Sequence, residues 1–307
     1  MILSCGEALI DMLPREGAGG EPCFAPCPGG SVFNTAIALG RLGAPAGFLS
    51  GISTNLFGAV LTEALAAARV DASLAIRSDR PTTLAFVRLV EGQASYAFYD
   101  ENTAGRMLAP GEMPALPAQV QALFFGGISL AVEPCGAAYE ALMLHEAPHR
   151  LTMLDPNIRP GFIRDEGAYR ARLDRMIAAA DIVKLSDEDL RWLAGPGEIE
   201  PLAHGLLALG PKLVFVTEGA VGAHGFSAHD TVFVPAQRVA VVDTVGAGDT
   251  FNAGVLAELH RAGLLSKTAV ASADGALIEG CLRLGVAAAA ITVSRAGANP
   301  PWAEELQ

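Results

Sequence analysis

The chain has 307 residues, of which 51% are hydrophobic and 18% are charged, a composition typical of a globular protein with a large core and not of a disordered one. Its 33 acidic and 21 basic side chains give a formal net charge of −12, which argues against nucleic acid or an anionic membrane as the main partner, because both bind clustered Lys and Arg. Any phosphate group that the chain binds must therefore be met locally, by backbone amides, a metal ion or a few placed cations.

Three further features predict a cytoplasmic protein. No stretch reaches the roughly 18 uninterrupted apolar residues of a membrane span, and Glu7 and Asp11 interrupt the apolar N-terminus, which is unlike a secretory signal. The five cysteines lack the paired spacing of a metal site and are expected to be reduced thiols.

Short apolar runs rich in β-branched and aromatic residues alternate along the chain with amphipathic segments rich in Ala and Leu. The predicted strands are Ile2–Cys5, Ala46–Ile52, Ala122–Phe125, Leu151–Asp155, Ile182–Ser186, Lys212–Thr217 and Val239–Val242. The predicted helices are Asn34–Leu42, Phe57–Ala68, Gly136–His145, Tyr169–Ala180, Asp187–Leu193, Gly248–Arg261 and one that ends near Ile291. Because continuous apolar strands alternate with helices, we expect an α/β fold with a mostly parallel sheet covered on both faces.

One region breaks this alternation. Thr83–Val90 and Ser95–Tyr99 alternate in the two-residue period of half-exposed strands and are joined by a turn at Glu91-Gly92-Gln93. Such a hairpin would project from the sheet edge as a flap, and the Gly- and Pro-rich segment Met12–Pro28 could supply the rest of it. We therefore expect one domain over residues 1–307, with a lid formed by about 12–33 and 78–107. The exposed hairpin edge also offers a surface for a homodimer formed lid to lid.

The most informative segment runs from Asp243 to Phe251 and opens a predicted helix after an apolar run. Gly246, Ala247 and Gly248 are small enough to let the chain turn tightly and bring backbone N–H groups close to a ligand. The helix N-terminus adds unsatisfied donors and partial positive charge, so the turn is suited to hold a phosphoryl group. Asp249 is then either a base that accepts a proton from an attacking hydroxyl or only a helix cap.

A second glycine-rich segment begins at Gly29 and Gly30, ahead of another predicted helix. Paired glycines allow a small polar ligand to approach the backbone, and Asn34 offers both a donor and an acceptor to hydroxyl groups. Asp11, just after the first strand, can accept two hydroxyl hydrogen bonds. Alternatively, the glycines form only a turn and Asn34 is an N-cap.

Taken together, the two segments resemble the ribokinase-like (PfkB) family of carbohydrate kinases, over essentially the whole chain. The resemblance implies a three-layer α/β/α sandwich with a mainly parallel sheet and a small β lid over the sugar. It also implies an ATP-dependent sugar kinase in which Asp249 is the base and Gly246, Ala247 and Gly248 form the anion hole. The residues implied to hold the sugar are Asp11, Gly29, Gly30 and Asn34.

The same resemblance predicts the nucleotide site. The segment Thr217–Gly222 matches the family's nucleotide loop, so Thr217, Gly219 and Gly222 are expected to bind ATP. The family often carries Asn-x-x-Glu, a motif that helps to place Mg²⁺ through water, where this chain has Ser186-Asp187-Glu188-Asp189. Ser186 and Asp189 are the substitutes that the sequence offers.

Two kinds of metal ion are implied. Mg²⁺ is expected to bridge and neutralise the nucleotide phosphates. Many relatives also use a monovalent cation such as K⁺ beside the anion hole, and its ligands here would be Asp243 and the Val245 carbonyl. The alternative for Asp243 is a structural turn residue.

The substrate is predicted from the stretch Asp155–Pro160, which together with Gly6–Asp11 resembles the bacterial fructokinase branch. A ketohexose, fructose above all, is therefore the expected substrate. The related 2-keto-3-deoxygluconate kinases share the Asp-Pro-Asn-x-Arg stretch, so this sugar acid, another sugar or a nucleoside are alternatives. A sugar-sensing protein that kept the fold without catalysis is the alternative from another functional class.

Three more side chains have two interpretations each. Arg159, at the C-terminal end of a predicted parallel strand, either contacts a phosphate or an acidic substrate or is a surface residue. Lys184 either reaches the transferring phosphate or forms a buried ion pair. Phe98 either covers the sugar ring or belongs to the hydrophobic core of the lid.

Overall fold

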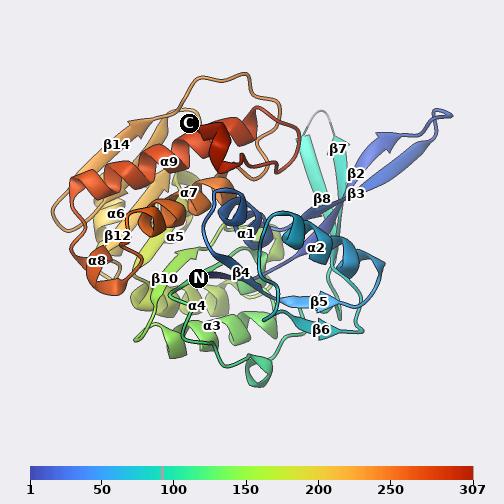
Figure 1. The fold of residues 1–307 in the computed structure, drawn as a ribbon, viewed down its shortest axis with the longest axis horizontal. Helices are drawn as coiled ribbons and strands as arrows, with labels where there is room; N and C mark the ends of the chain where they lie inside the picture. Colours follow the sequence, from blue (N-terminus) through green and yellow to red (C-terminus); the bar gives the residue numbers. More distant parts are fainter. Residues whose placement is uncertain (91–92, 307) are drawn as a thin grey trace.

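The computed structural model describes residues 1–90 and 93–306, and a large sheet lies at its centre (Figure 1). In order across this sheet the strands are β14 (Thr231–Pro235), β13 (Gly222–Phe226), β12 (Leu213–Thr217), β11 (Ile182–Ser186), β10 (Leu151–Asp155), β9 (Ala122–Gly126), β1 (Ile2–Cys5) and β4 (Ala46–Leu49). The strands from β12 to β4 pair in parallel, whereas β13 pairs in antiparallel fashion with both β12 and β14. The carboxyl ends of the parallel strands therefore meet at one edge, where Ser186 pairs with Thr217 and Asp155 with Gly126.

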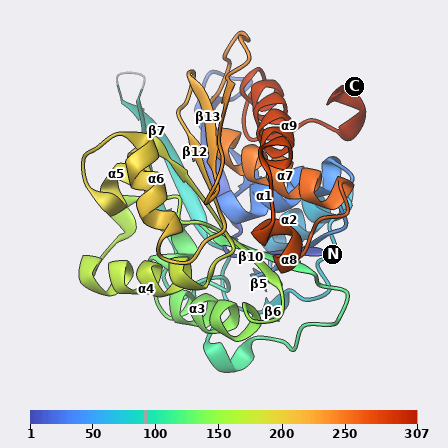
Figure 2. The ribbon, with the colours of Figure 1, turned by 90° about the vertical axis from the view of Figure 1, so that its left-hand side faces the viewer.

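Helices cover both faces of the sheet (Figure 2). One face carries α1 (Ser31–Arg41), α2 (Leu56–Ala67), α7 (Ala247–Arg261), α8 (Lys267–Ala271) and α9 (Gly275–Val293). The other carries α3 (Cys135–Glu146), α4 (Glu166–Ala179), α5 (Asp187–Ala194) and α6 (Ile199–Leu207). The described residues also form four short 3₁₀ helices, η1 (Pro110–Glu112), η2 (Ile128–Leu130), η3 (Pro160–Phe162) and η4 (Ala303–Leu306). This is the three-layer α/β/α arrangement that the sequence predicted.

The alternation of side chains along each strand produces two separate cores. In β1, Ile2 faces the core under α1 and α7, while Leu3 and Cys5 face the core under α3. Because successive side chains of a strand point to opposite faces, a strand buried on both sides must be apolar throughout. This requirement is why the parallel strands could be located as continuous apolar runs.

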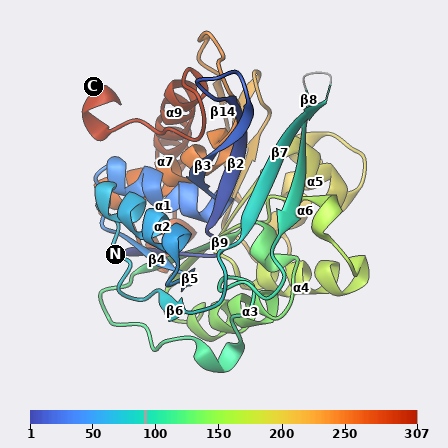
Figure 3. The same ribbon diagram turned by 90° about the vertical axis from the view of Figure 1, so that its right-hand side faces the viewer.

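A smaller sheet projects from one side of the molecule (Figures 1 and 3). Its strands, in order, are β3 (Pro22–Gly29), β2 (Leu9–Glu16), β7 (Leu84–Val90) and β8 (Gln93–Tyr99). The hairpin expected from the two-residue period is β7–β8, and the Gly- and Pro-rich segment expected to complete the flap forms β2 and β3. Residues 91 and 92 of the expected turn lie outside the described residues.

Two strand predictions differ from the structure. The run at 46–52 is not one strand, because it breaks after β4 and continues as β5 (Gly51–Ser53), which pairs with β6 (Ile76–Ser78). Gly51 marks the break, since a Cβ there would overlap the Ala104 carbonyl oxygen. The prediction of a strand at Val239–Val242 is wrong. These residues form a loop after β14 in which Val241 and Val242 are exposed, and the Val242 N–H donates to the carbonyl oxygen of Val293, the last residue of α9.

Among the described residues, α9 is a helix long and apolar enough to cross a membrane, with a mean hydropathy of 1.7 over an 18-residue window. Its buried residues, among them Ile278, Leu282 and Val286, belong to the core on the α7 face of the sheet. The opposite side of the helix carries an exposed ion pair between Arg283 and Glu279. The apolar character of α9 is therefore explained by its packing in the core.

We predict that the packing of α7 against α9 depends on Gly254, because a Cβ there would lie 2.6 Å from Gly285 Cα. Gly254→Ala should lower the free energy of unfolding by about 2 kcal/mol through overpacking. The matched control is Gly205→Ala in α6, where a Cβ meets no atom within 4 Å and the change should stabilise by up to about 1 kcal/mol. Urea denaturation measures both, and equal effects would contradict the close approach of the helices.

Candidate active site

The site forms where the N-termini of α1 and α7 meet the carboxyl ends of β10 and β11. Asp249 lies in the first turn of α7, and its side chain is directed at α1 and not at its own helix. Ser31 Oγ donates to Asp249 Oδ1 at 2.8 Å, and Asn34 Nδ2 donates to Asp249 Oδ2 at 2.9 Å. Thr35 Oγ1 donates to the Asp249 carbonyl oxygen at 3.2 Å. Asp249 is therefore not the helix cap, a position that Gly246 occupies.

Burial sets the charge state of Asp249. The residue is only 7% exposed, and this loss of solvent raises the pKa of its carboxyl to about 6, against the opposing effect of the hydrogen bonds from Asn34 and Ser31. The negative charge of Asp155 also raises the pKa, while the positive charge of Lys184 lowers it. A carboxyl with a pKa near 6 is mostly ionised at neutral pH. Its pKa is also close enough to neutral pH for the carboxylate to take up a proton during a reaction.

Asn157 extends this hydrogen-bonded chain. Its Nδ2 donates to Ser31 Oγ at 2.7 Å, so that Asn157, Ser31 and Asp249 are linked in a row. Asn157 holds a left-handed backbone with φ of 44°, a conformation that Asn tolerates better than most residues. Neither Ser31 nor Asn157 was predicted to be a site residue. The signal for Ser31 in the sequence was its place after Gly29 and Gly30, and the signal for Asn157 was its place in the stretch Asp155–Pro160.

Lys184 forms the buried ion pair that was one of its two interpretations. Its Nζ lies 3.0 Å from Asp155 Oδ2, and both side chains are at most 5% exposed. Asn252 Nδ2 donates to the same carboxylate oxygen at 2.7 Å. A Cβ at Gly248 would lie 3.1 Å from Lys184 Nζ, which brings the ammonium group to the turn that opens α7. The ion pair therefore also places a cation beside the predicted anion hole.

Ser186 and Asp189 lie together at the start of α5. Ser186 Oγ caps the helix by accepting from the Asp189 N–H at 3.0 Å, and Asp189 Oδ1 accepts from the Ile158 N–H at 3.2 Å. Burial, followed by the charge of Asp155, raises the pKa of Asp189 to about 6. Arg159 is exposed, and its charge lowers the pKa of Asp189. Of the two residues that replace Asn-x-x-Glu, Asp189 is therefore close enough to Asp155 and Arg159 to interact with their charges.

The predicted sugar residues gather around the start of α1. Gly30 is the N-cap of α1 with φ of 109°, and a Cβ there would lie 3.0 Å from the Glu7 carbonyl oxygen. A Cβ at Gly29 would overlap Asp11 Oδ2. Asn34 lies inside α1 and is not its N-cap. Burial raises the pKa of Asp11 to about 6, so this carboxylate lies in a partly desolvated position next to the glycines.

The nucleotide-loop residues lie on the turn between β12 and β13. Thr217 ends β12, and the Glu218 N–H donates to the Gly222 carbonyl at 2.9 Å. Gly219 has φ of 49° and is exposed. At Gly222 a Cβ would overlap the Val234 carbonyl oxygen. The loop is open to solvent, and it lies at the same edge of the sheet as Ser186, because the two strand ends are paired.

Asp243 joins two loops beside the start of α7. Its Oδ1 accepts from the Val245 N–H at 3.0 Å, and its Oδ2 accepts from the Gly297 N–H at 2.9 Å. A Cβ at Gly246 would lie 2.7 Å from the Ala298 Cβ, so the loop after α9 closes over the turn at 246–248. These bonds support a structural role for Asp243 and leave further lone pairs on its oxygens for a cation.

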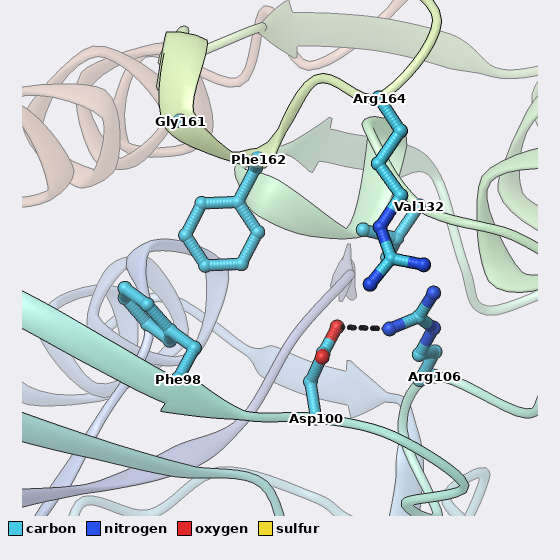
Figure 4. A pocket seen from close by; sticks show the side chains of 7 residues that line it. All are labelled: Phe98, Asp100, Arg106, Val132, Gly161, Phe162 and Arg164. Atoms are coloured by element: carbon cyan, nitrogen blue, oxygen red, sulfur yellow. Dashed lines mark hydrogen bonds and ion pairs between the residues drawn. The ribbon is translucent and has the colours of Figure 1, made fainter.

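Phe98 lies apart from these groups, on β8 of the small sheet. Its ring packs edge to face against Phe162, with ring centroids 4.2 Å apart, and both rings border a cavity (Figure 4). Phe162 belongs to η3 and lies five residues after Asn157, in the β10–α4 loop, which comprises residues 156–165. The small sheet therefore contacts the loop that also reaches the Asp249 carboxylate through Asn157 and Ser31.

Metal binding was considered from the donor set. In residues 1–90 and 93–306, no group of three or more His, Cys, Asp or Glu side chains is placed to hold a metal ion. Besides Asp249, the buried carboxylates near the anion hole include Asp189 and Asp155, and Asp155 is already paired with Lys184. This set fits a Mg²⁺ ion held chiefly by nucleotide phosphates and water, as Mg²⁺ is in many kinases.

Comparison with known proteins identifies close relatives of the chain. A family model described as pfkB family carbohydrate kinase matches residues 1–305. A fructokinase of Rhizobium leguminosarum bv. trifolii is 56% identical over 274 residues, which are 89% of this chain and 84% of that relative. The solved structure of a Xylella fastidiosa fructokinase with bound ATP has a TM-score of 0.88 at 28% identity, covering 99% of this chain and 96% of that one.

A second solved structure extends the comparison. A fructokinase double mutant of Vibrio cholerae, in a form with bound fructose, ADP and potassium ion, has a TM-score of 0.84 at 25% identity. It covers 97% of this chain and 93% of that one. These likenesses over nearly the whole chain confirm the predicted ribokinase-like fold.

The buried Lys184–Asp155 pair yields a stability prediction. Lys184→Met should lower the free energy of unfolding by about 3 kcal/mol, because it leaves a carboxylate that is 1% exposed without its cation. The matched control is Lys267→Met, which breaks a more exposed pair with Asp181 and should cost about 1 kcal/mol. Denaturant unfolding at pH 7 measures both variants, and an equal loss would contradict the role given to burial.

Proposed function

The chain belongs to the pfkB family of carbohydrate kinases, and from that premise we propose that it transfers the γ-phosphoryl group of ATP to a primary hydroxyl of fructose. The family makes it an ATP-dependent sugar kinase. The choice of fructose is supported by the 56% identity to the Rhizobium fructokinase. The observation that carries the proposal is a buried carboxylate, Asp249, held by two donors at the mouth of a helix N-terminus.

Asp249 acts as the general base. A hydroxyl that enters the site replaces the Ser31 hydroxyl on Asp249 Oδ1, a geometry that is supported by the 2.8 Å hydrogen bond already made there. Asn34 keeps the second oxygen in place, so the carboxylate cannot turn away as the proton is transferred. The raised pKa suits this task, because a base works best when its pKa is near the operating pH.

The start of α7 stabilises the transferred phosphoryl group. The first amides of a helix have no carbonyl one turn earlier to bind, and the helix dipole adds positive potential at the same place. Gly246, Ala247 and Gly248 form this turn, in which the Ala247 N–H makes only a long hydrogen bond of 3.4 Å to the Thr244 carbonyl oxygen, and the ammonium group of Lys184 lies next to Gly248. Charge developing on the phosphoryl oxygens would thus meet donors that are already oriented.

Sugar binding is assigned to the region where β2, the glycines and α1 meet. Asp11, Gly29, Gly30 and Asn34 are assigned to hold the sugar next to the base. Arg159 and Phe98 lie farther away, and we assign them to the sugar position once the lid is closed. The small sheet then serves as a lid formed by about 12–33 and 78–107, which excludes water when it closes and so limits ATP hydrolysis. The contact of Phe98 with Phe162 supports a lid that closes against the β10–α4 loop.

ATP is assigned to the β12–β13 turn, with Thr217, Gly219 and Gly222 bordering it and Ser186 nearby. Mg²⁺ would be placed by Asp189 through water, and it supplies charge neutralisation on the nucleotide phosphates when bound. A monovalent cation would take the Asp243 carboxylate and the Val245 carbonyl as ligands. The potassium ion present in the Vibrio cholerae fructokinase structure supports this second assignment.

We assign the enzyme to the cytoplasm and to a homodimer formed through the lid. The five cysteines are free thiols in the structure, which fits a reducing compartment. On the small sheet, Phe24 and Tyr99 are 47% and 62% exposed, and each packs edge to face against Phe86. An exposed aromatic cluster on a sheet with free edges is a surface that a second lid could cover.

We predict that Asp249→Asn abolishes turnover and leaves fructose binding largely intact, because the amide cannot take up the proton but keeps the shape of the site. ADP release with MgATP, KCl and fructose measures turnover, and calorimetry measures sugar binding. Asp174→Asn, on the exposed side of α4, is the matched control and should behave as wild type.

Two outcomes of this experiment would count against the proposal. Near-normal turnover of Asp249→Asn would remove Asp249 as the base. Wild-type protein that binds fructose without releasing ADP would favour the sugar-sensing alternative. Testing ribose, tagatose, 2-keto-3-deoxygluconate and adenosine beside fructose shows whether the kinase stands with another substrate.

A further inference from the structure

The chain that follows α9 passes the start of α7 and then the end of α1. Residues 294–300 form a loop without regular secondary structure. Within it, the Gly297 N–H donates to Asp243 Oδ2 at 2.9 Å, and Ala298 lies so close to Gly246 that a Cβ on this glycine would be 2.7 Å from the alanine Cβ. The loop therefore forms one wall of the turn that we assign to the transferred phosphoryl group.

Arg41, the last residue of α1, holds the same loop from its other side. Its Nη1 donates to Asn299 Oδ1 at 2.6 Å and to the Pro300 carbonyl oxygen at 2.7 Å, and a charged donor makes such bonds stronger than a neutral one does. The Asn299 N–H donates in turn to the Gly297 carbonyl oxygen at 2.8 Å. The residue that Arg41 binds is thus directly bonded to the residue that binds Asp243.

Trp302 joins the end of this segment to the same arginine. The Cζ atoms of Arg41 and Arg69 lie over the indole ring, 5.5 and 4.9 Å from its centroid, within the range of a cation–π attraction. The Trp302 N–H donates to Glu305 Oε2 at 2.8 Å, and the Glu305 carboxylate also pairs with Arg295 near the beginning of the loop. The segment is therefore closed on itself, and Arg41 links it to α1.

α1 thus makes contacts of a different kind at its two ends. Ser31 and Asn34 in its first turn bind the Asp249 carboxylate, whereas Arg41 at its last position binds the loop that lies against Gly246. At a rise of 1.5 Å per residue these two ends are about 15 Å apart. A change at Arg41 can therefore disturb the phosphoryl end of the site without displacing the residues around the sugar.

We propose that Arg41 is a positioning residue for nucleotide binding, and that it acts through residues 294–306, which we call the strap. By holding the strap at Asn299, Arg41 keeps the loop against Gly246, so that the turn at 246–248 stays in the conformation that meets the nucleotide phosphates. The proposal rests on the proposed function, since it takes the transferred phosphoryl group to lie at that turn. Without Arg41 the strap would move away, and nucleotide affinity would fall while sugar affinity stayed the same.

The first test is calorimetric binding of a non-hydrolysable ATP analogue to the full chain, with Mg²⁺ and without sugar. Arg41→Met should weaken the analogue about tenfold, because both charge-assisted bonds to the strap are lost. Asn299→Ala removes one of them at an exposed position and should weaken it about threefold. The matched control is Arg69→Gln, which removes a guanidinium from Trp302 but no bond to the loop, and should leave the affinity unchanged.

The second test separates the two substrates in the steady state. In Arg41→Met the KM for ATP should rise about tenfold, while the KM and the calorimetric affinity for fructose stay at wild-type values. A merely structural role would weaken both ligands together. Equal losses for fructose and for the analogue, or equal effects of Arg41→Met and Arg69→Gln on analogue binding, would therefore overturn the proposal.

A failure of this proposal can be told from a failure of the proposed function. Wild-type protein that releases no ADP with fructose would count against the substrate, but analogue binding needs neither sugar nor turnover and still decides on the strap. Should Arg41→Met not fold, Asn299→Ala decides alone, because this side chain is exposed. Its threefold loss of analogue affinity would support the strap, and wild-type affinity would contradict it.

Discussion

The structure depends on a buried carboxylate that must stay able to ionise. Asp249 is removed from water, which raises its pKa, and donors from α1 lower it again, so that the balance lies at about 6. This balance requires α1 and α7 to be held in register, although Ser31 and Asp249 are 218 residues apart in the chain. Close contacts at Gly30 and Gly246 hold the N-termini of these two helices in place.

Small residues make that placement possible. Gly30 begins α1 directly over the backbone of Glu7, and Gly246 begins α7 with φ of 78° against Ala298. The Ser31 N–H donates to Glu7 Oε1 at 3.0 Å, which anchors the start of α1 to the end of β1. A side chain larger than hydrogen at either glycine would separate the two helix N-termini and remove the donors from Asp249.

The sequence allowed the layers and the parallel strands to be anticipated, because buried strands are apolar throughout. It also singled out Asn34 and Asp249 as site residues, because both stand in long motifs, but not the hydrogen bond between them. It did not reveal Ser31 or Asn157, whose roles depend on side chains meeting across 126 residues of chain. The hairpin β13–β14 was missed because β13 contains two glycines and a histidine. The run Val239–Val242 misled because exposed valines have the same composition as a buried strand.

The most direct test of the account is the pH dependence of kcat/KM for fructose, measured on wild type and Ser31→Ala side by side. Asp249 must be ionised to accept a proton, so activity should rise with pH through about 6 and then level off. Loss of the Ser31 hydrogen bond raises the pKa of Asp249, so the rise should move to higher pH in Ser31→Ala, by about one unit. A profile that rises near pH 4, or one that Ser31→Ala leaves in place, would contradict Asp249 as the base held by α1.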